Sequence, residues 1–399
     1  MWAWLVTASL AGILFVWLRY ARALAVMARA PVLTGVTPAL PADMPWPRLS
    51  VVVACRDEAA GIRAATVSLL AQDYPALEIV AVDDRSQDAT GTILDELAAE
   101  HPTLRVVHVQ ALPPDWLGKT HALDQGAARA TGDWILFTDA DVVFAPDTLR
   151  RAMAWVLADG LGHGVALPRF IAPGWFERAF VSVFALFFIL HLQLDRLRRP
   201  GTAAHVGIGA FNLVRRDGYE AIGGHRPLRL EVADDVKLGL LLRRNGVRQG
   251  CADSGGLVCV RWQSGFFASM RGLVKNFFAG SEFSWLATAR AALLIPVATA
   301  VPVASLALPL PAAARLLALA AALVPMVLHG AIARRLVGGS GYEGLLLPVV
   351  GLCLAGVASA SAIVTTCRGG VLWRGTHYPL RELRAGCVRD RDVPLDRAP

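Results

Sequence analysis

The sequence predicts an α/β domain with a mostly parallel sheet, joined to transmembrane helices at both ends. Short β-branched runs alternate with segments of helical spacing, and acidic residues concentrate between about residues 57 and 147. The last third of the chain is nearly all Ala, Leu, Val and Pro, punctuated by Arg. The 399 residues are 55% hydrophobic and 18% charged, with a mean hydropathy of +0.48. This is too apolar for an ordinary soluble protein and too charged for a pure membrane bundle.

Strand-like runs alternate with helical segments in the first half of the chain. The strands are predicted at Leu49–Cys55, Leu77–Val82, Leu104–Val109 and Trp134–Thr138, and the helices at 59–72, at 86–100 with Ser86 as N-cap, and at 119–130. This alternation implies βαβ units. Neither a G-x-G-x-x-G after the first strand nor a G-x-x-x-x-G-K-S/T is present, so a dinucleotide fingerprint and a P-loop are not supported.

Apolar segments of spanning length are expected at both ends of the chain. Trp2 to about Trp17 precedes several arginines, which favours a span with a cytoplasmic C-terminal end over a cleaved signal peptide. The Phe-rich segment 175–194 has polar ends and is expected to lie in the headgroup plane. Further spans are expected at about 291–310, 316–333 and 345–366. Three C-terminal spans would place the Arg-rich tail outside, whereas its charge favours the inside, and the sequence leaves this conflict open.

Charge and cysteine usage narrow the partners and the compartment. The net charge of +7 comes from arginines that flank apolar runs, which suits anionic lipid headgroups. These arginines form no basic stripe interleaved with aromatic residues, so no nucleic-acid partner is expected. The six cysteines are scattered without a C-x-x-C pair, which indicates a reducing compartment and neither a zinc site nor a disulfide framework.

Acidic motifs occur where three of the predicted strands end. They are Arg56-Asp57-Glu58, Asp83-Asp84-Arg85 and Asp139-Ala140-Asp141, and each alone could be an ordinary turn or helix cap. Because the carboxyl ends of parallel strands meet at one crevice, we expect these side chains to converge. Asp139 and Asp141 can hold a divalent cation, with its remaining positions left to water and substrate phosphates.

Two further motifs are candidates for the same crevice. Gly118-Lys119 places a cation at a helix start, where phosphate binds well, although a solvated helix start is equally compatible. Asp234-Asp235 opens a helical stretch, where acids are also stabilised by the macrodipole. Adjacent residues do not share a helix face, so at most one aims into the site, where it could act as a general base. Close-packed loops around this site are expected at 207–212 and 223–225, with His225 as a secondary candidate.

As an ordered set, these motifs resemble family 2 glycosyltransferases of GT-A fold. The resemblance covers roughly residues 48–285. Trp116–His121 and the tail Trp373-Arg374-Gly375-x-x-Tyr378 look most like the membrane-bound, lipid-glycosylating branch. That branch includes ceramide glucosyltransferase-like, hopanoid-associated and carotenoid glycosyltransferases. The resemblance implies an inverting, metal-dependent transfer of a sugar from a nucleotide sugar, with UDP-sugar the expected donor, to the hydroxyl group of a membrane lipid.

The resemblance also implies roles on the donor side. Asp83 and Asp84 would contact the nucleotide base and ribose, with Glu58 nearby. Lys119 would lie close to the diphosphate, and Asp139 would also contact the donor.

Two acid pairs would bind the metal ion and catalyse the transfer. Asp139 and Asp141 would place Mg²⁺ or Mn²⁺ on the diphosphate. Asp235 would be the base that deprotonates the acceptor hydroxyl. Asp234 stands beside it, where many relatives have Glu.

One motif of the related enzymes is absent. The Q-x-x-R-W of processive and many ceramide-type relatives is missing, which puts polymer synthesis in doubt; Arg271 or Lys275 would then supply the phosphate contact. Transfer to polyprenyl phosphate or a polysaccharide, and a catalytically idle membrane scaffold, remain alternatives.

The resemblance and the apolar segments together define the expected organisation. The parts are an N-terminal anchor at 1–30, a GT-A catalytic domain at 48–285 with an interfacial helix at about 175–195, C-terminal transmembrane helices at 290–368, and a basic tail at 369–399. The expected location is the bacterial inner membrane, crossed several times, with the catalytic domain in the cytoplasm.

Overall fold

The computed structural model describes residues 2–199 and 201–390. The chain forms two compact units. The sheet unit comprises residues 30–169, 196–261 and the chain from 372 onward, and the helix unit comprises the chain up to 29, 170–195 and 262–371. Residues 391–399 of the predicted tail lie outside the described residues.

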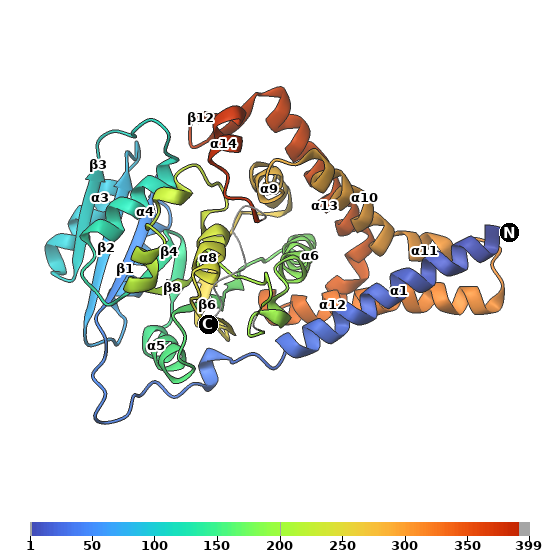
Figure 1. The fold of residues 1–399 in the computed structure, drawn as a ribbon, viewed down its shortest axis with the longest axis horizontal. Coiled ribbons are helices and arrows are strands. Elements are labelled where there is room, and N and C mark those ends of the chain that lie inside the picture. The colour runs from blue at the N-terminus through green and yellow to red at the C-terminus, as the bar shows by residue number, and fades with distance from the viewer. Residues whose placement is uncertain (1, 200, 391–399) are drawn as a thin grey trace. The chain divides into compact units, whose positions relative to one another are not determined.

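A seven-stranded sheet, in the order β3-β2-β1-β4-β8-β6-β9, organises the sheet unit (Figure 1). Strands β3, β2, β1 and β4 are parallel, β8 is antiparallel to both of its neighbours, and β9 is parallel to β6. The strands are β1 (Leu49–Cys55), β2 (Leu77–Asp84), β3 (Leu104–Val109), β4 (Trp134–Asp139), β6 (His163–Leu167), β8 (Asn212–Arg215) and β9 (Gln249–Asp253). The mostly parallel sheet predicted from the sequence is confirmed.

Seven α-helices belong to the described part of the sheet unit. They are α2 (Ile62–Leu70), α3 (Thr90–Glu100), α4 (Gly118–Arg129), α5 (Thr148–Ala158), α7 (Arg216–Ala221), α8 (Asp234–Arg244) and α14 (Leu380–Gly386). Helix α4 lies directly on β1, because a Cβ at Gly126 would come within 2.4 Å of Val52 Cγ1. Burial of Val52, Val82 and Leu123 in the same cluster holds this layer together.

The predicted cap at Ser86 is wrong. Helix α3 begins at Thr90 and has no side-chain cap. The hydroxyl oxygen of Ser86 instead accepts the Asp57 N–H at 3.0 Å, and the Ser86 N–H donates to Asp83 Oδ1 at 3.2 Å. Ser86 therefore ties together the loops that follow β1 and β2.

Small sheets complete this unit. Strands β5 (Val142–Phe144), β10 (Val258–Val260) and β7 (Arg169–Phe170) form one, and β11 (Gly370–Trp373) with β12 (Thr376–Pro379) forms a hairpin. The 3-10 turns are η1 (Leu33–Gly35), η2 (Leu194–Arg196), η3 (Arg226–Leu228) and, in the helix unit, η4 (Tyr342–Leu346).

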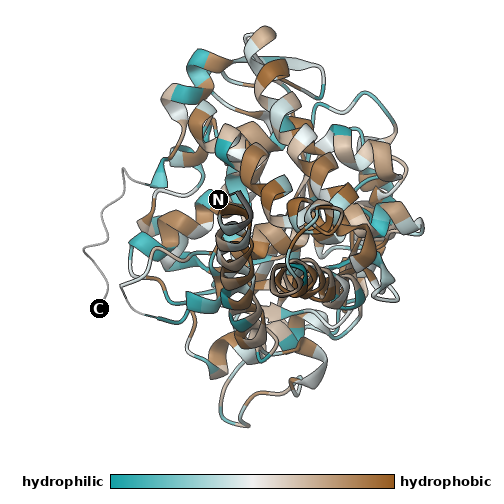
Figure 2. Ribbon diagram, turned by 90° about the vertical axis from the view of Figure 1, so that its right-hand side faces the viewer, coloured by the Kyte–Doolittle hydropathy of each residue, from teal (hydrophilic) through white to brown (hydrophobic). Residues whose placement is uncertain are grey.

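Apolar residues predominate along the helices of the helix unit (Figure 2). These helices are α1 (Trp2–Met27), α6 (Trp175–His191), α9 (Phe266–Gly280), α10 (Trp285–Thr299), α11 (Val301–Ser305), α12 (Ala312–Val337) and α13 (Leu347–Cys367). Within the described residues, four segments are long and apolar enough to cross a membrane: 4–27, 175–196, 312–337 and 342–367.

A continuous span at 291–310 does not form. Helix α10 ends at Thr299 and α11 restarts at Val301, with Pro302 in its first turn. Proline has no N–H to continue the helical ladder, which explains the break. The 15 residues of α10 reach only about 22 Å at 1.5 Å per residue, short of the roughly 30 Å hydrocarbon core. At the N-terminus, by contrast, α1 continues past Trp17 to Met27.

Candidate active site

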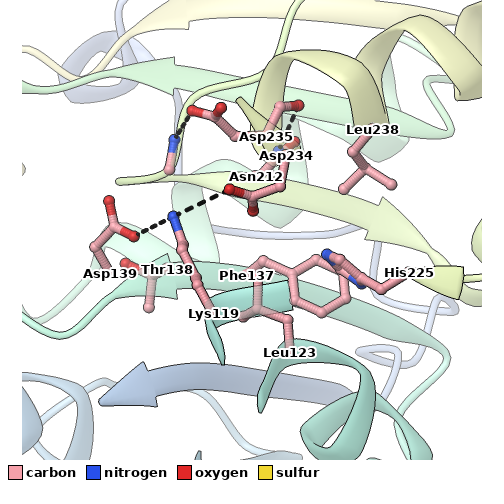
Figure 3. A pocket seen from close by; sticks show the side chains of 11 residues that line it. Lys119, Leu123, Phe137, Thr138, Asp139, Asn212, His225, Asp234, Asp235 and Leu238 are labelled. Carbon is pink, nitrogen blue, oxygen red and sulfur yellow. Dashed lines mark hydrogen bonds and ion pairs between the residues drawn. The ribbon is translucent and has the colours of Figure 1, made fainter. Parts of the chain in front are cut away.

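Lys119 joins two acidic elements at the carboxyl end of the sheet (Figure 3). Its Nζ lies 2.8 Å from Asp139 Oδ1, at the end of β4, and 3.6 Å from Asp234 Oδ1, in the first turn of α8. Burial alone would lower the pKa of Lys119, but Asp139, Asp234 and Asp235 raise it above its usual range. Lys119 is therefore a permanent cation among three carboxylates.

Backbone groups fix the carboxylate of Asp235. Its Oδ2 accepts the Gly209 N–H at 2.7 Å, and its Oδ1 accepts the Val236 N–H at 2.9 Å. The Asp139 N–H donates to the Gly209 carbonyl at 3.0 Å, so a single loop residue holds both acids. The position of Asp235 at a helix N-terminus further favours its charged form.

Close backbone contact seats this loop on helix α8. A Cβ at Gly207 would lie 1.7 Å from the Asp235 carbonyl oxygen, and a Cβ at Gly239 would lie 1.8 Å from the Val206 carbonyl oxygen. No larger residue fits either position without moving the backbone. The predicted close-packed loop at 207–212 thus lies against the acid pair.

Burial and crowding make the acids costly to ionise. Burial, with the charges of Asp139 and Glu58, raises the pKa of Asp141 to about 7. Burial likewise raises the pKa values of Asp234 and Asp235, which Lys119 opposes. Perturbed carboxylates gathered in a crevice are typical of functional sites.

The space enclosed among these side chains is small. It is about 10 Å³ and is lined by Lys119, Asp139, Asp234, Asp235, Phe137 and His225, among others. This is room for about one water molecule. A donor would therefore bind over the carboxylates, at the open strand ends, and not inside this cavity.

His225 is a structural residue in this geometry. It is 1% exposed, its Nδ1 lies 2.7 Å from the Tyr219 hydroxyl, and its ring contacts Phe137. Burial, with the Lys119 charge, lowers its pKa to about 3. It is neutral at physiological pH.

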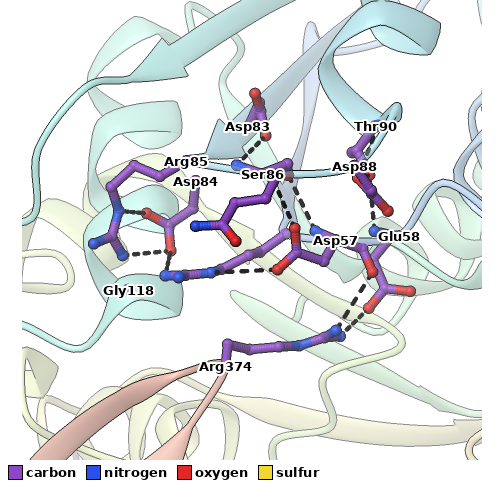
Figure 4. A network of polar contacts seen from close by, with 12 residues as sticks. Asp57, Glu58, Asp83, Asp84, Arg85, Ser86, Asp88, Thr90, Gly118 and Arg374 are labelled. Carbon is purple, nitrogen blue, oxygen red and sulfur yellow. Dashed lines mark hydrogen bonds and ion pairs between the residues drawn. The ribbon is translucent and has the colours of Figure 1, made fainter.

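The ends of β1 and β2 form an adjoining polar network (Figure 4). Asp84 accepts from Arg85 Nε at 2.8 Å, and Asp83 pairs with His108 Nδ1 at 3.1 Å. Glu58 pairs with Arg374, which follows the last long helix in sequence. Burial raises the pKa of Glu58, which Arg374 opposes.

The sequence-predicted residues thus fall into three sets. Lys119 contacts Asp139 and Asp234 directly, and Asp235 lines the same cavity. Asp141 and Glu58 act on this group through their charges. Asp83 and Asp84 lie at the neighbouring strand ends with partners of their own. Arg271 and Lys275 lie on α9 of the helix unit, four residues apart and hence on one helix face.

Two contacts were not predicted as part of the site. Arg374 pairs with Glu58, and the Tyr378 hydroxyl accepts the Gly118 N–H at 3.2 Å. Both residues belong to the tail motif, whose spacing was the one available signal in the sequence.

The carboxylate oxygens at the end of β4 fit a divalent cation that arrives together with a diphosphate. Among residues 2–199 and 201–390, no three His, Cys, Asp or Glu side chains are arranged to hold a metal ion. Mg²⁺, however, commonly uses only one or two carboxylates plus substrate phosphates. Asp139 and Asp141 supply such a pair, and the raised pKa of Asp141 marks a place where a cation would relieve charge crowding.

A mostly parallel sheet that ends in acidic residues and a lysine at its carboxyl edge is the arrangement of a GT-A-like α/β domain. Residues 50–223 match the family model Glycosyl transferase family 2. This part of the chain is therefore similar to glycosyltransferase family 2.

Individual curated proteins are similar to part of this chain. The chain is 30% identical over 217 residues to beta-monoglucosyldiacylglycerol synthase of Synechocystis, and the match covers 53% of this chain and 43% of that protein. It is 24% identical over 236 residues to 4,4'-diaponeurosporenoate glycosyltransferase of Staphylococcus aureus, covering 58% and 61%. The chain therefore spans about half the length of these curated relatives.

One solved structure shares the fold over nearly the whole chain. It is a mannosyltransferase from Pyrobaculum calidifontis in complex with GDP-Man and Mn²⁺. The TM-score is 0.57 at 23% identity, over 90% of this chain and 96% of that one.

Proposed function

We propose that this protein is an inverting, metal-dependent glycosyltransferase that moves a sugar from a nucleotide sugar to the hydroxyl group of a membrane lipid. The expected donor is a UDP-sugar. The observation that carries the proposal is the convergence of Lys119, Asp139, Asp234 and Asp235 at the sheet edge. One cation and a carboxylate pair suit a diphosphate with its metal, and a further fixed carboxylate suits a base.

The donor occupies the carboxyl ends of β1, β2 and β4. Asp83 and Asp84 contact the base and ribose, with Glu58 nearby, and Lys119 approaches the diphosphate. A Mg²⁺ or Mn²⁺ ion held by Asp139 and Asp141 would offset the charge that develops on the leaving diphosphate.

The acceptor hydroxyl attacks the anomeric carbon on the face opposite the diphosphate. A bond forms between the acceptor oxygen and the sugar carbon while the carbon–oxygen bond to the diphosphate breaks. The electron pair leaves with the nucleoside diphosphate, and the acceptor proton passes to Asp235. The two backbone N–H groups on Asp235 hold its carboxylate in place for this transfer.

The lipid acceptor is supported by the relatives and the apolar helices. The printed names of both curated relatives refer to lipid-like acceptors, a diacylglycerol and a carotenoid acid. Four apolar segments are long enough to cross the bilayer in which such an acceptor resides. Arg271 and Lys275 remain candidates for a phosphate contact.

Chain connectivity supports an even number of crossings between the domain and the tail, and the arginines of the tail support a cytoplasmic location. Strands β6 and β8 are paired, and α6 lies between them in sequence, so a single crossing by α6 would separate two hydrogen-bonded strands. Tyr378 contacts Gly118, so the tail lies on the same side as the sheet.

Helix α12 packs along α1 in the same direction. Leu310, just before the start of α12, clusters with Leu10, and Val337, at its end, clusters with Phe170. Crossings by α1, by the broken helix α10–α11 and by α12 therefore satisfy these facts and leave α6 and α13 in the interface.

Cysteine labelling of intact bacterial cells tests this topology. In a chain whose native cysteines are replaced, Leu308→Cys, in the exposed connection between α11 and α12, should react with an impermeant thiol reagent, and Arg381→Cys should not. Labelling at Arg381→Cys would contradict the topology.

The activity is tested with the full chain purified in detergent. Radiolabelled UDP-sugars and GDP-sugars are supplied with a bacterial lipid extract, and products are identified by mass spectrometry. We expect a glycolipid that requires Mg²⁺ or Mn²⁺ and disappears with EDTA. A product on polyprenyl phosphate or polysaccharide would replace the acceptor assignment, and neither transfer nor donor hydrolysis with any donor would favour the idle scaffold.

A further inference from the structure

The hairpin β11–β12 places an arginine at an unusual backbone position. Its two-residue turn consists of Arg374 and Gly375, with φ of 47° and 76°. Positive φ at both residues is what a type I′ turn requires, and Asn, Asp or Gly are favoured there. The arginine is therefore not explained by the turn, and its side chain is the feature that needs a role.

The guanidinium group of Arg374 rests on the loop after β1 (Figure 4). It pairs with Glu58 through Nη2, and Nη1 lies 3.4 Å from the Asp57 carbonyl oxygen. Tyr378, 7% exposed, anchors the other strand of the hairpin at the first residue of α4. The hairpin thus contacts both loops that border the proposed diphosphate position.

Glu58 pairs with Arg374 and also interacts electrostatically with the acids at the end of β4. The charge of Asp139 acts on Glu58, and the charge of Glu58 acts on Asp141. The Arg374 side chain is 43% exposed and that of Glu58 is 27% exposed. Arg374 can therefore turn from Glu58 toward a ligand while both charged groups stay in contact with water. Lys119, in contrast, is already bound to Asp139 and Asp234.

We propose that Arg374 is a donor-binding residue that contacts the diphosphate of the nucleotide sugar, and that Glu58 holds its guanidinium when the donor is absent. This inference rests on the proposed function. The planar guanidinium matches phosphate oxygens with two parallel hydrogen bonds and stays charged at any physiological pH. The tail that follows the last membrane helix thereby supplies part of the donor site.

Arg374→Asn is the most informative variant. Asn followed by Gly is the preferred pair for a type I′ turn, so the hairpin is retained while the cation is lost. Arg374→Lys keeps a charge but not the fork, and Arg381→Asn, on the exposed face of α14, is the matched control.

The full chain in detergent, with Mn²⁺, is titrated with UDP and with uridine, or with GDP and guanosine if the unmodified chain prefers that base. We expect Arg374→Asn to weaken diphosphate binding about 10- to 100-fold, as for hydrogen bonds to charged groups, while nucleoside binding changes less than about twofold. Arg374→Lys should fall between, and Arg381→Asn should match the unmodified chain.

Three results would overturn the inference. They are equal weakening of diphosphate and nucleoside, no weakening of either, or a loss of diphosphate affinity in Glu58→Gln as large as in Arg374→Asn, since Glu58 should only compete with the ligand. An unmodified chain that binds no nucleoside diphosphate would instead defeat the proposed function, which keeps the two failures apart.

Discussion

The ammonium group of Lys119 lies 2.8 Å from the carboxylate of Asp139, and this contact joins helix α4 to the end of strand β4. The same group reaches Asp234 at 3.6 Å. A single cation thus balances acids from two elements that are nearly 100 residues apart in sequence. Loss of the Lys119 charge should therefore affect both the stability of the fold and the proposed transfer reaction.

Replacing Lys119 with Met should destabilise the protein and abolish transfer. The buried Asp234 would lose its compensating cation, a loss of about 1–3 kcal/mol in the free energy of unfolding. The melting temperature by tryptophan fluorescence measures this. Adding Asp234→Asn to the Lys119→Met variant should restore most of the melting temperature but not the transfer. A double variant no more stable than the single one would show that the pair does not interact as described.

Asp235→Asn should reduce transfer to a lipid hydroxyl about 100- to 10,000-fold, the usual contribution of a general base. The amide also places N–H groups against the Gly209 or Val236 N–H, so some loss of thermal stability is expected. Donor binding, measured with the nucleoside diphosphate and Mn²⁺, should stay within a few-fold and serves as the control for folding. Retained turnover would exclude Asp235 as the base.

Asp141 should make metal-free stability depend on pH. Its pKa is about 7 in the folded chain and near 3.8 when unfolded. Between these values the unfolded chain releases a proton that the folded chain still holds, so stability falls as pH rises, and the loss is complete above about pH 7. Melting temperatures in EDTA from pH 4 to 8 should show this fall, reduced in Asp141→Asn. The same slope in both proteins would contradict the assignment.

Gly207→Ala should disable the site through the backbone alone. The new Cβ would meet the Asp235 carbonyl oxygen at 1.7 Å and displace the first turn of α8. We expect loss of transfer and a lower melting temperature. Gly35→Ala, where a Cβ meets nothing within 4 Å, is the matched control and should behave as the unmodified protein. Normal activity in Gly207→Ala would mean that the loop and the helix are not in contact.

Local sequence patterns predicted the parallel half of the sheet well. Strands β1 and β3 have the predicted bounds, while β2 and β4 extend into the acids Asp83–Asp84 and Asp139 because those residues still pair with neighbouring strands. A run of β-branched residues reports a buried strand directly. A polar residue at the strand end does not mark where burial or pairing stops, since Asp83 and Asp84 are 7% and 3% exposed.

Contacts between distant segments could not be predicted in this way. The antiparallel insertion of β8, the Gly209 contacts with both acids, and the return of Arg374 to Glu58 depend on tertiary packing. Glycine spacing at 207–209 indicated close packing without naming its partner. Serine at position 86 resembled a helix cap because the same hydroxyl chemistry serves a loop contact equally well.

The Tyr378 contact with Gly118 has a consequence for biosynthesis. The strands and helices of the sheet unit are translated early, yet the acceptor for the first N–H of α4 lies beyond α13. The proposed site is therefore completed only after α13 has been synthesised. A polypeptide released before Tyr378 has every acid of the proposed site but lacks this hydrogen bond at the start of α4.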